Sequence, residues 1–390
     1  MAGNRKIHPT VWVLGCVSLF MDVSSETIHS LLPVFLVSVI GAGVETVGLI
    51  EGVAEATAMA TRVFSGALSD RLGKRKALAL VGYGLGALSK PFFALASSVG
   101  AVFGARFVDR IGKGIRGAPR DALIADVTPE EQRGGAYGLR QSLDSVGAFL
   151  GPLLAMGLML ATGGRFRVVF WLACIPAALA VTTLFLGVRE PAAVAKKAYR
   201  SPLSRQALER LGRRYWLVVL VGAVFTLARF SEAFLLLRAE SVGLAASFVP
   251  LALIVMNIAY SLTSYPVGWL SDRIGRQGLL AAGLVALIGA DALLALADRP
   301  GTALAGAALW GVHMGLTQGL LAALIADAVT PDLRGTAFGF FGLISGLALF
   351  LASVLAGWLW QHYGIPATFW TGAGIAAVAL LGFTELRHKT

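Results

Sequence analysis

Gly66-Ala-Leu-Ser-Asp70-Arg71-Leu-Gly73-Lys74 returns later in the chain as Gly268-Trp-Leu-Ser-Asp272-Arg273-Ile-Gly275-Arg276, a shift of 268 − 66 = 202 positions. Two other segments return with a shift of 201 positions: Ala122-Leu-Ile-Ala-Asp126 as Ala323-Leu-Ile-Ala-Asp327, and Arg133-Gly-Gly-Ala-Tyr-Gly138 as Arg334-Gly-Thr-Ala-Phe-Gly339. Segments that recur so nearly in step indicate an internal duplication. The chain is therefore predicted to contain two related halves.

The sequence between these motifs is strongly apolar. Of the 390 residues, 56% are hydrophobic and 14% are charged, whereas soluble domains carry about 25% charged residues. About 20 apolar residues span the hydrocarbon layer, and backbone exposed to lipid must bond within its own segment, so the long runs should be helices. We expect twelve spans, at approximately 10–38, 46–67, 77–97, 101–123, 135–161, 167–188, 215–237, 247–270, 278–297, 302–325, 335–360 and 366–385.

The predicted fold is an all-α membrane protein with twelve transmembrane helices in two pseudo-symmetric six-helix bundles. The first bundle covers residues 1–190, a cytoplasmic linker covers 191–214, and the second bundle covers 215–390. Because six is an even number, both halves enter the membrane from the same side and form parallel repeats about an axis along the membrane normal. Such a pair is expected to leave a cavity between its halves.

The basic residues behind the net charge of +11 are concentrated in alternate loops. By the positive-inside rule, both termini and the central linker are predicted to be cytoplasmic, in a multi-pass protein of the bacterial inner membrane. The basic segments are short and scattered, which argues against nucleic-acid binding. Cys16 and Cys174 lie far apart inside apolar runs, so no disulfide, metal site or resident cofactor is predicted.

The loop motif resembles that of the major facilitator superfamily, and the resemblance covers essentially the whole chain. In that family the loop between helices two and three latches the halves on the cytoplasmic side. The resemblance therefore implies gating roles for Gly66, Asp70, Arg71, Gly73, Lys74 and Arg75, and for Gly268, Asp272 and Arg273 in the degenerate second copy.

Two further motifs are similar to family patterns. Arg106-Phe-Val-Asp109-Arg110-Ile-Gly112 is similar to the helix-four pattern, with Arg110 where a glycine is common. Gly147-x-x-x-Gly151-Pro152 is similar to an antiporter signature, although Leu153 and Leu154 replace its following glycines. Gly147 and Gly151 should permit close helix contact and Pro152 should permit bending, so these three and Asp109 are further gating candidates.

Ionisable residues inside the predicted spans are costly in a bilayer and should face a partner or a wet cavity. Asp22, Glu26 and His29 are spaced i, i+4 and i+7, which places them on one helical face. Two carboxylates so close would not both ionise easily, so Asp22 and Glu26 are the first candidates for proton coupling. The alternative is a structural cluster paired with arginine from another helix.

Complementary charges occur on the second and fourth helices. Glu51, Glu55 and Arg62 share one face, while Arg106, Asp109, Arg110 and Lys113 share another, and the two sets are expected to neutralise one another. Glu51 and Glu55 therefore join the proton-coupling candidates. The spacing of Arg140 and Asp144, and of Arg229 and Glu232, predicts pairing within a helix. The candidate substrate contacts are His29, Arg106, Arg110, Asp144, Arg229, Glu232, Asn257, Tyr260, His313 and Gln318.

Together these features predict a proton-coupled secondary transporter that exports a small organic compound by alternating access. The predicted partners are substrate, protons and the lipid bilayer, and the chain is expected to be a monomer. Uptake of a small metabolite and transport of a metal ion or chelate through Asp22, Glu26, His29 and His313 are the alternatives, with a non-transporting sensor or assembly protein as the third. No HExxH, GxSxG or Walker motif is present, so an enzyme or a nucleotide-driven pump is not expected. Lys90 and Asp291 lie near predicted helix centres without an assigned role.

Overall fold

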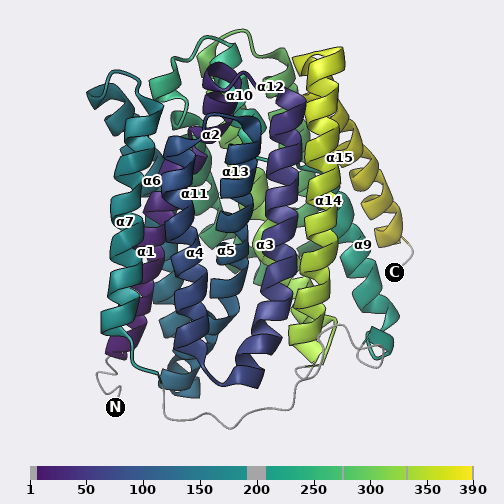
Figure 1. Cartoon of the computed structure of the whole chain (residues 1–390). Coiled ribbons are helices and arrows are strands. Elements are labelled where there is room, and N and C mark those ends of the chain that lie inside the picture. Colours follow the sequence, from purple (N-terminus) through teal and green to yellow (C-terminus); the bar gives the residue numbers. More distant parts are fainter. Residues whose placement is uncertain (1–6, 191–207, 275, 331–332, 389–390) are drawn as a thin grey trace. The chain divides into compact units, whose positions relative to one another are not determined.

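Helices account for nearly all of the computed structural model, which describes residues 7–190, 208–274, 276–330 and 333–388 (Figure 1). The predicted linker residues 191–207 lie outside this range. Two compact units can be separated: residues 1–29 with 57–201, and residues 30–56 with 202–390. Segment 30–56, predicted to belong to the first bundle, thus packs with the second unit, and helix α3 (Val44–Leu72) runs through both.

The first unit contains five further long helices. They are α1 (Pro9–His29), α4 (Arg75–Leu95), α5 (Val99–Val127), α6 (Arg133–Ala161) and α7 (Phe166–Gly187), with the 3-10 turn η2 (Glu130–Gln132) before α6. Helix α1 packs against α6 and α7, and α4 packs against α5 and α7. Helix α1 therefore lies at the centre of this unit.

The second unit repeats this arrangement. Its elements are α2 (Leu32–Val34), the π-helical η1 (Phe35–Val39), α9 (Arg213–Ala228), α10 (Ala233–Ser241), η3 (Ala246–Phe248), α11 (Leu251–Ile274), α12 (Arg276–Leu296), α13 (Pro300–Asp327), α14 (Arg334–Tyr363) and α15 (Ile365–His388). Helix α13 packs against α11 and α12, while α15 packs against α12, α14 and α9. Segment 30–56 joins this unit because α2 packs on α10, and because Gly48 and Gly52 allow α3 to approach α14 closely.

In the part of the chain that the structure describes, twelve helical segments are long enough to cross a membrane. Nine segments of the described chain also pass a test of apolarity: Pro9–Ser38, Arg75–Leu95, Arg133–Ala161, Phe166–Gly187, Arg213–Ser241, Ala246–Gly268, Arg276–Leu296, Pro300–Asp327 and Arg334–Tyr363. The other three are α3, α5 and α15. Helices α3 and α5 have 29 residues each but carry more charge, and the described apolar part of α15 is Ile365–Leu381. Each predicted span coincides with one of these twelve.

Two of the spans consist of two helical pieces separated by a short break. Helix α1 ends at His29, and the chain resumes at Leu32 with α2 and the π-helical segment. Helix α9 ends at Ala228, and α10 resumes at Ala233. The prediction of an unbroken helix over 215–237 is therefore wrong, because residues 229–232 leave the helix. Interrupted membrane helices expose backbone groups at depth, and transporters use such breaks at binding sites.

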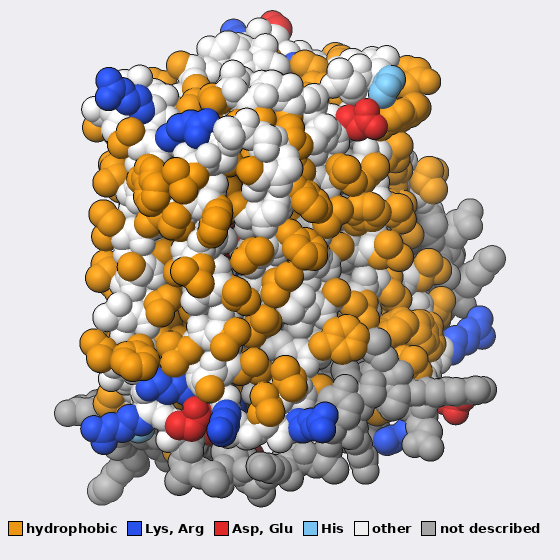
Figure 2. All heavy atoms as spheres, in the orientation of Figure 1, with side chains coloured by type: hydrophobic (Ala, Val, Ile, Leu, Met, Phe, Trp, Pro, Cys, Tyr) orange, Lys and Arg blue, Asp and Glu red, His pale blue; other side chains and the backbone are white. Residues whose placement is uncertain are grey.

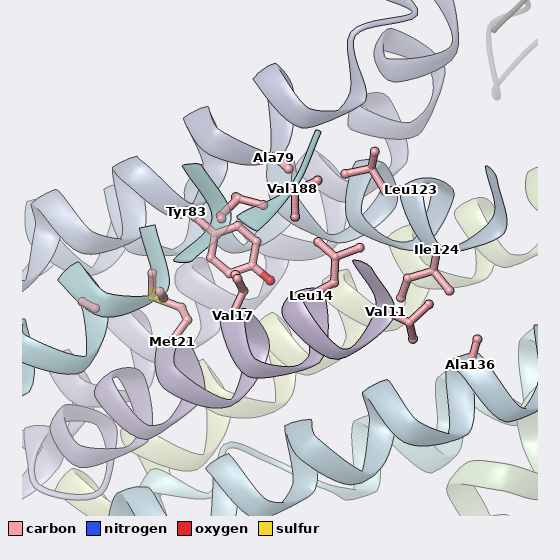
Figure 3. Packing of buried hydrophobic residues seen from close by; sticks show 13 residues of the cluster. Val11, Leu14, Val17, Met21, Ala79, Tyr83, Leu123, Ile124, Ala136 and Val188 are labelled. Carbon is pink, nitrogen blue, oxygen red and sulfur yellow. The ribbon is translucent and has the colours of Figure 1, made fainter. Parts of the chain in front are cut away.

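The core of the first unit is formed by one apolar face of α1. Val11, Leu14, Val17 and Met21 are fully buried and meet Tyr83 of α4 together with residues of α5, α6 and α7 (Figure 3). In lipid, apolar burial gives little net drive, so helix association depends on close van der Waals packing. On the face shown in Figure 2, hydrophobic side chains cover the middle, and Lys and Arg side chains lie towards the top and bottom.

Each half has an equivalent ion pair between the arginine that begins one helix and an aspartate at the end of the next helix. Arg75 of α4 lies 2.8 Å from Asp126 of α5, and Arg276 of α12 lies 2.5 Å from Asp327 of α13. Both members are shifted by the same amount, since 276 − 75 and 327 − 126 both equal 201. The duplication read from the sequence is therefore reproduced in side-chain contacts.

Candidate functional site

The first unit brings two carboxyl groups together at the junction of α1 and α6. Asp22 of α1 and Asp144 of α6 lie within hydrogen-bonding reach of each other. Asp144 Oδ1 is buried and receives no hydrogen bond from the described residues. Two ionised carboxylates in such positions repel each other, which makes this pair a candidate for holding a proton.

Arginine side chains surround this carboxyl pair. Arg116 Nη2 lies 3.5 Å from Asp22 Oδ1, and Arg120 Nη1 lies 3.8 Å from Asp144 Oδ1. Arg140 Nη2 donates to Asp144 Oδ2 at 2.9 Å, which confirms the predicted pairing within helix α6. Three guanidinium groups thus place positive charge around the two carboxyl groups.

Glycines hold α6 against the acidic face of α1. A Cβ at Gly147 would stand 3.0 Å from Asp22 Cβ, and one at Gly151 would stand 2.5 Å from Glu26 Cβ. Thr27 Oγ1 also donates to the Gly151 carbonyl oxygen at 3.1 Å. Gly147 and Gly151 are thus required for the approach of the two backbones, as their spacing predicted. Pro152 follows inside the helix and is buried.

Glu26 has a different partner from Asp22. Its carboxylate lies 3.3 Å from His29 Nδ1 on the same helix, at the point where α1 ends. Lys113 and Arg110 of α5 also act on it electrostatically. The structure therefore separates the two carboxylates that the sequence placed together: Asp22 pairs with Asp144, and Glu26 pairs with His29.

A fully buried ion pair lies beside these groups. Lys90 Nζ of α4 donates to Asp109 Oδ1 of α5 at 2.7 Å and to Ser25 Oγ of α1 at 2.9 Å. Arg110 Nε lies 3.3 Å from the other oxygen of Asp109, and Arg106 is buried one turn before it. Asp109, a gating candidate, is thus engaged in a contact that joins α1, α4 and α5.

The second unit presents polar groups at the break between α9 and α10. Arg229 follows the last residue of α9 and lies in the electrostatic reach of Glu232, Tyr260 and Glu55. Arg229 and Glu232 interact as predicted, but not within one helix, because both lie in the break between α9 and α10. Glu51 is buried in the same part of α3. The expected neutralisation of Glu51 and Glu55 by helix four stays a prediction, whereas Arg62 of α3 lies 3.7 Å from Asp121 of α5.

The remaining polar candidates of the second unit are spread over two helices. His313 of α13 is buried, and its Nδ1 lies 2.8 Å from the Gly283 carbonyl oxygen of α12. Asn257 and Tyr260 are half-buried on α11, and Gln318 is half-buried on α13. Within the described residues, no three His, Cys, Asp or Glu side chains converge as a metal ion would require.

The gating candidates of the first loop have distinct environments. Gly73 has φ 63°, a left-handed conformation that ends α3 and that glycine adopts without strain. Arg71 and Lys74 are exposed. Gly66 packs on Ala118, and Arg75 forms an ion pair with Asp126. Gly268 and Arg273 are exposed on α11. The side chains of Asp70 and Asp272 lie outside the described residues.

Sequence reasoning missed three residues of the first-unit site. Arg116 and Arg120 were not among the candidate residues, and Lys90 had no role, yet all three are buried ion-pair members. The signal was present in α5, where basic residues continue at helical spacing from Arg106 to Arg120. In the structure Arg106, Arg110, Arg116 and Arg120 of this series are buried.

The chain belongs to the Major Facilitator Superfamily, whose family model matches residues 14–238 and 233–389. It is 32% identical over 383 residues to the uncharacterized MFS-type transporter MJ1317 of Methanocaldococcus jannaschii, covering 96% of this chain and 94% of that protein. It is 25% identical over 378 residues to the multidrug resistance protein MdtH of Photorhabdus laumondii, covering 93% and 90% respectively.

Solved structures share the same fold. The nucleoside transporter NupG superposes with a TM-score of 0.78 at 16% identity, covering 97% of this chain and 99% of that one. A peptide transporter of the POT type superposes with a TM-score of 0.81 at 12% identity, covering 98% and 95%. The predicted fold class is therefore confirmed: the protein is a multi-pass membrane transporter of twelve helices in two related bundles, and not an enzyme.

Proposed function

We propose that this transporter couples proton movement to the export of a small organic compound by alternating access. The observation that carries the proposal is the carboxyl pair of Asp22 and Asp144, set among Arg116, Arg120 and Arg140. The pair can hold one proton in one conformation and release it when α1 and α6 separate. If the proton is then released to water at the opposite membrane face, each transport cycle carries a proton across the membrane. The proton gradient would thereby drive the conformational change.

Export is favoured over uptake by two observations. Gly147 and Gly151, which belong to the antiporter-like motif, pack directly against Asp22 and Glu26, so that motif borders the proposed proton site. In addition, one relative that covers most of the chain carries the name multidrug resistance protein. Both support an exchange of protons for an outgoing compound.

The polar groups of the second unit are the proposed substrate contacts. Arg229, Glu232 and Tyr260 gather at the helix break, with His313 within electrostatic reach of Arg229. Broken helices in transporters leave backbone donors and acceptors for a ligand, in addition to side chains. We further propose a monomer in the bacterial inner membrane with both termini cytoplasmic, as the loop charges indicate.

The test begins with purified protein and a panel of antibiotics, organic acids, sugars and divalent metals. Thermal-shift measurements at two pH values identify a stabilising compound, and that compound is then used in proteoliposomes with an imposed pH gradient. The proposal predicts that the gradient drives movement of the compound against its concentration, in the direction opposite to protons. Movement with the protons would favour uptake, and a metal as the stabilising ligand would favour metal transport. Stabilisation without transport under any gradient would favour a sensor.

A further inference from the structure

A carboxylic acid in the second unit lies where no described group can balance its charge. Asp291 of α12 is completely buried, and neither of its carboxyl oxygens has a hydrogen-bond partner among the described residues. A buried carboxylate without a cation or a donor is among the costliest groups in a folded protein. Asp291 is therefore an anomaly that needs a specific explanation.

The internal repeat shows what is missing at this position. With the shift of 201 that relates the two halves here, Asp291 corresponds to Lys90 and Trp310 corresponds to Asp109. In the first unit, Lys90 and Asp109 form a buried ion pair at 2.7 Å. In the second unit the acid stands in place of the lysine, and Trp310 supplies an indole instead of a counter-charge. Trp310 Nε1 is itself buried without a partner in the described structure.

The surroundings of Asp291 are apolar and tightly packed. A Cβ at Gly372 of α15 would stand 2.7 Å from Asp291 Oδ2, 3.2 Å from the Phe230 ring and 3.3 Å from the Ala228 carbonyl oxygen. Phe230 in turn packs against Trp310 at 5.1 Å and against Phe369 at 5.5 Å between ring centroids. Asp291 thus lies beside the end of α9, where the helix breaks and its last carbonyl groups lose their helical donors.

The titratable groups on the elements around α12 are engaged elsewhere. His313 on α13 contacts the Gly283 carbonyl oxygen, Asp327 at the end of α13 binds Arg276, and Arg229 interacts with Glu232, Tyr260 of α11 and Glu55. Arg238 of α10 donates to the carbonyl oxygens of Leu294 and Ala297 at the end of α12. The described part of α15 that packs on α12, Ile365–Leu381, contains no charged residue. None of these side chains donates a hydrogen bond to either carboxyl oxygen of Asp291.

We propose that Asp291 is a second proton-binding site of the transporter, filled when α12, α15 and the end of α9 are packed as observed, and emptied when that packing opens. The proton comes from water and returns to water, and binding converts the carboxylate to a neutral acid that can donate to a carbonyl oxygen of the α9 end. A metal cation would need several oxygen ligands, and the described residues bring only this one carboxylate. The inference rests on the proposed proton coupling and adds a site in the other half of the molecule.

The protonation of Asp291 can be tested directly by infrared spectroscopy on the reconstituted full-length protein, as the difference between the spectra of wild type and variant. A protonated buried carboxyl group gives a carbonyl absorption distinct from that of an ionised carboxylate. The Asp291→Asn variant keeps the size of the side chain and cannot ionise, so part of that absorption should disappear. The matched control is Asp298→Asn, which removes an exposed carboxylate just beyond the end of the same helix and should leave the absorption unchanged.

Labelling with dicyclohexylcarbodiimide provides an independent readout, because this apolar reagent modifies protonated carboxyl groups. Mass spectrometry should find the adduct on Asp291 and not on the exposed Asp298. An infrared absorption that is identical in wild type and Asp291→Asn would overturn the proposal. Neither readout needs the substrate, so a failure of pH-driven transport in the wild type would count against the proposed function alone.

Discussion

Removal of one partner of the Lys90–Asp109 pair should strongly destabilise the first unit, and the loss of Asp109 should cost more than the loss of Lys90. The side chains are 1% and 3% exposed, and the two atoms lie 2.7 Å apart. Asp109→Asn leaves the Lys90 ammonium with neutral acceptors only, the new amide oxygen and Ser25 Oγ, and such an uncompensated buried charge costs about 3–5 kcal/mol. Lys90→Met costs less, about 1.5–3 kcal/mol for the lost charged hydrogen bond, because Arg110 still lies 3.3 Å from Asp109.

The assay is reversible unfolding in mixed micelles with increasing dodecyl sulfate, followed by tryptophan fluorescence. The double variant should be less destabilised than the sum of the single variants, with a coupling energy of about 0.5–3 kcal/mol. Glu130→Gln is the matched control, since Glu130 and Arg133 form an exposed pair at 3.1 Å whose loss should change little. Additive single effects, or an Asp109→Asn variant as stable as the control, would refute the reasoning.

Three further changes test the site and its supports. Glu26→Gln should abolish coupled transport while membrane insertion stays normal, as compared in proteoliposomes with and without a pH gradient; full activity with unchanged pH dependence would contradict this. Gly151→Ala should lower stability by about 1–3 kcal/mol in the unfolding assay, because the new methyl group would press on Glu26 Cβ. Gly157→Ala, with nothing within 4 Å, is its control, and equal stability of the two variants would be the adverse result. Asp70→Asn should slow turnover without weakening substrate binding, and lost affinity at normal turnover would count against a gating role.

Much of the fold could be predicted because hydrophobic length and internal repetition are properties of the sequence itself. Apolar runs fix where helices cross the bilayer, and the repeat from Gly66 to Gly268 fixes how many halves exist. The breaks after His29 and Ala228 were not predicted. No glycine or proline marks residues 229–232, so the interruption of the second of these helices depends on tertiary contacts such as the bond from the Ser231 amide to Ser353 Oγ.

The sequence pointed to several members of the first-unit site, among them Asp22, Glu26, Asp109 and Asp144, but to few of their partners. Spacing along one helix predicted that Asp22, Glu26 and His29 share a face. It also predicted the pairing of Arg140 with Asp144, which the structure confirms. Contacts between helices depend on rotation and depth, which no single helix encodes. For that reason the partnership of Asp22 with Asp144, and that of Lys90 with Asp109, emerged only when the helices were packed together.

The most direct test of the account is the effect of Asp22→Asn and Asp144→Asn on two modes of transport of the identified compound. Each variant should still exchange the compound across liposome membranes when both sides have the same pH. The residues proposed to bind the compound in the second unit, Arg229, Glu232 and Tyr260, are unchanged in both variants. Each should lose the acceleration that an imposed pH gradient gives the wild type, because the shared proton can no longer be bound and released. Gradient-driven transport at the wild-type rate in both variants would contradict the claim that this carboxyl pair carries the proton.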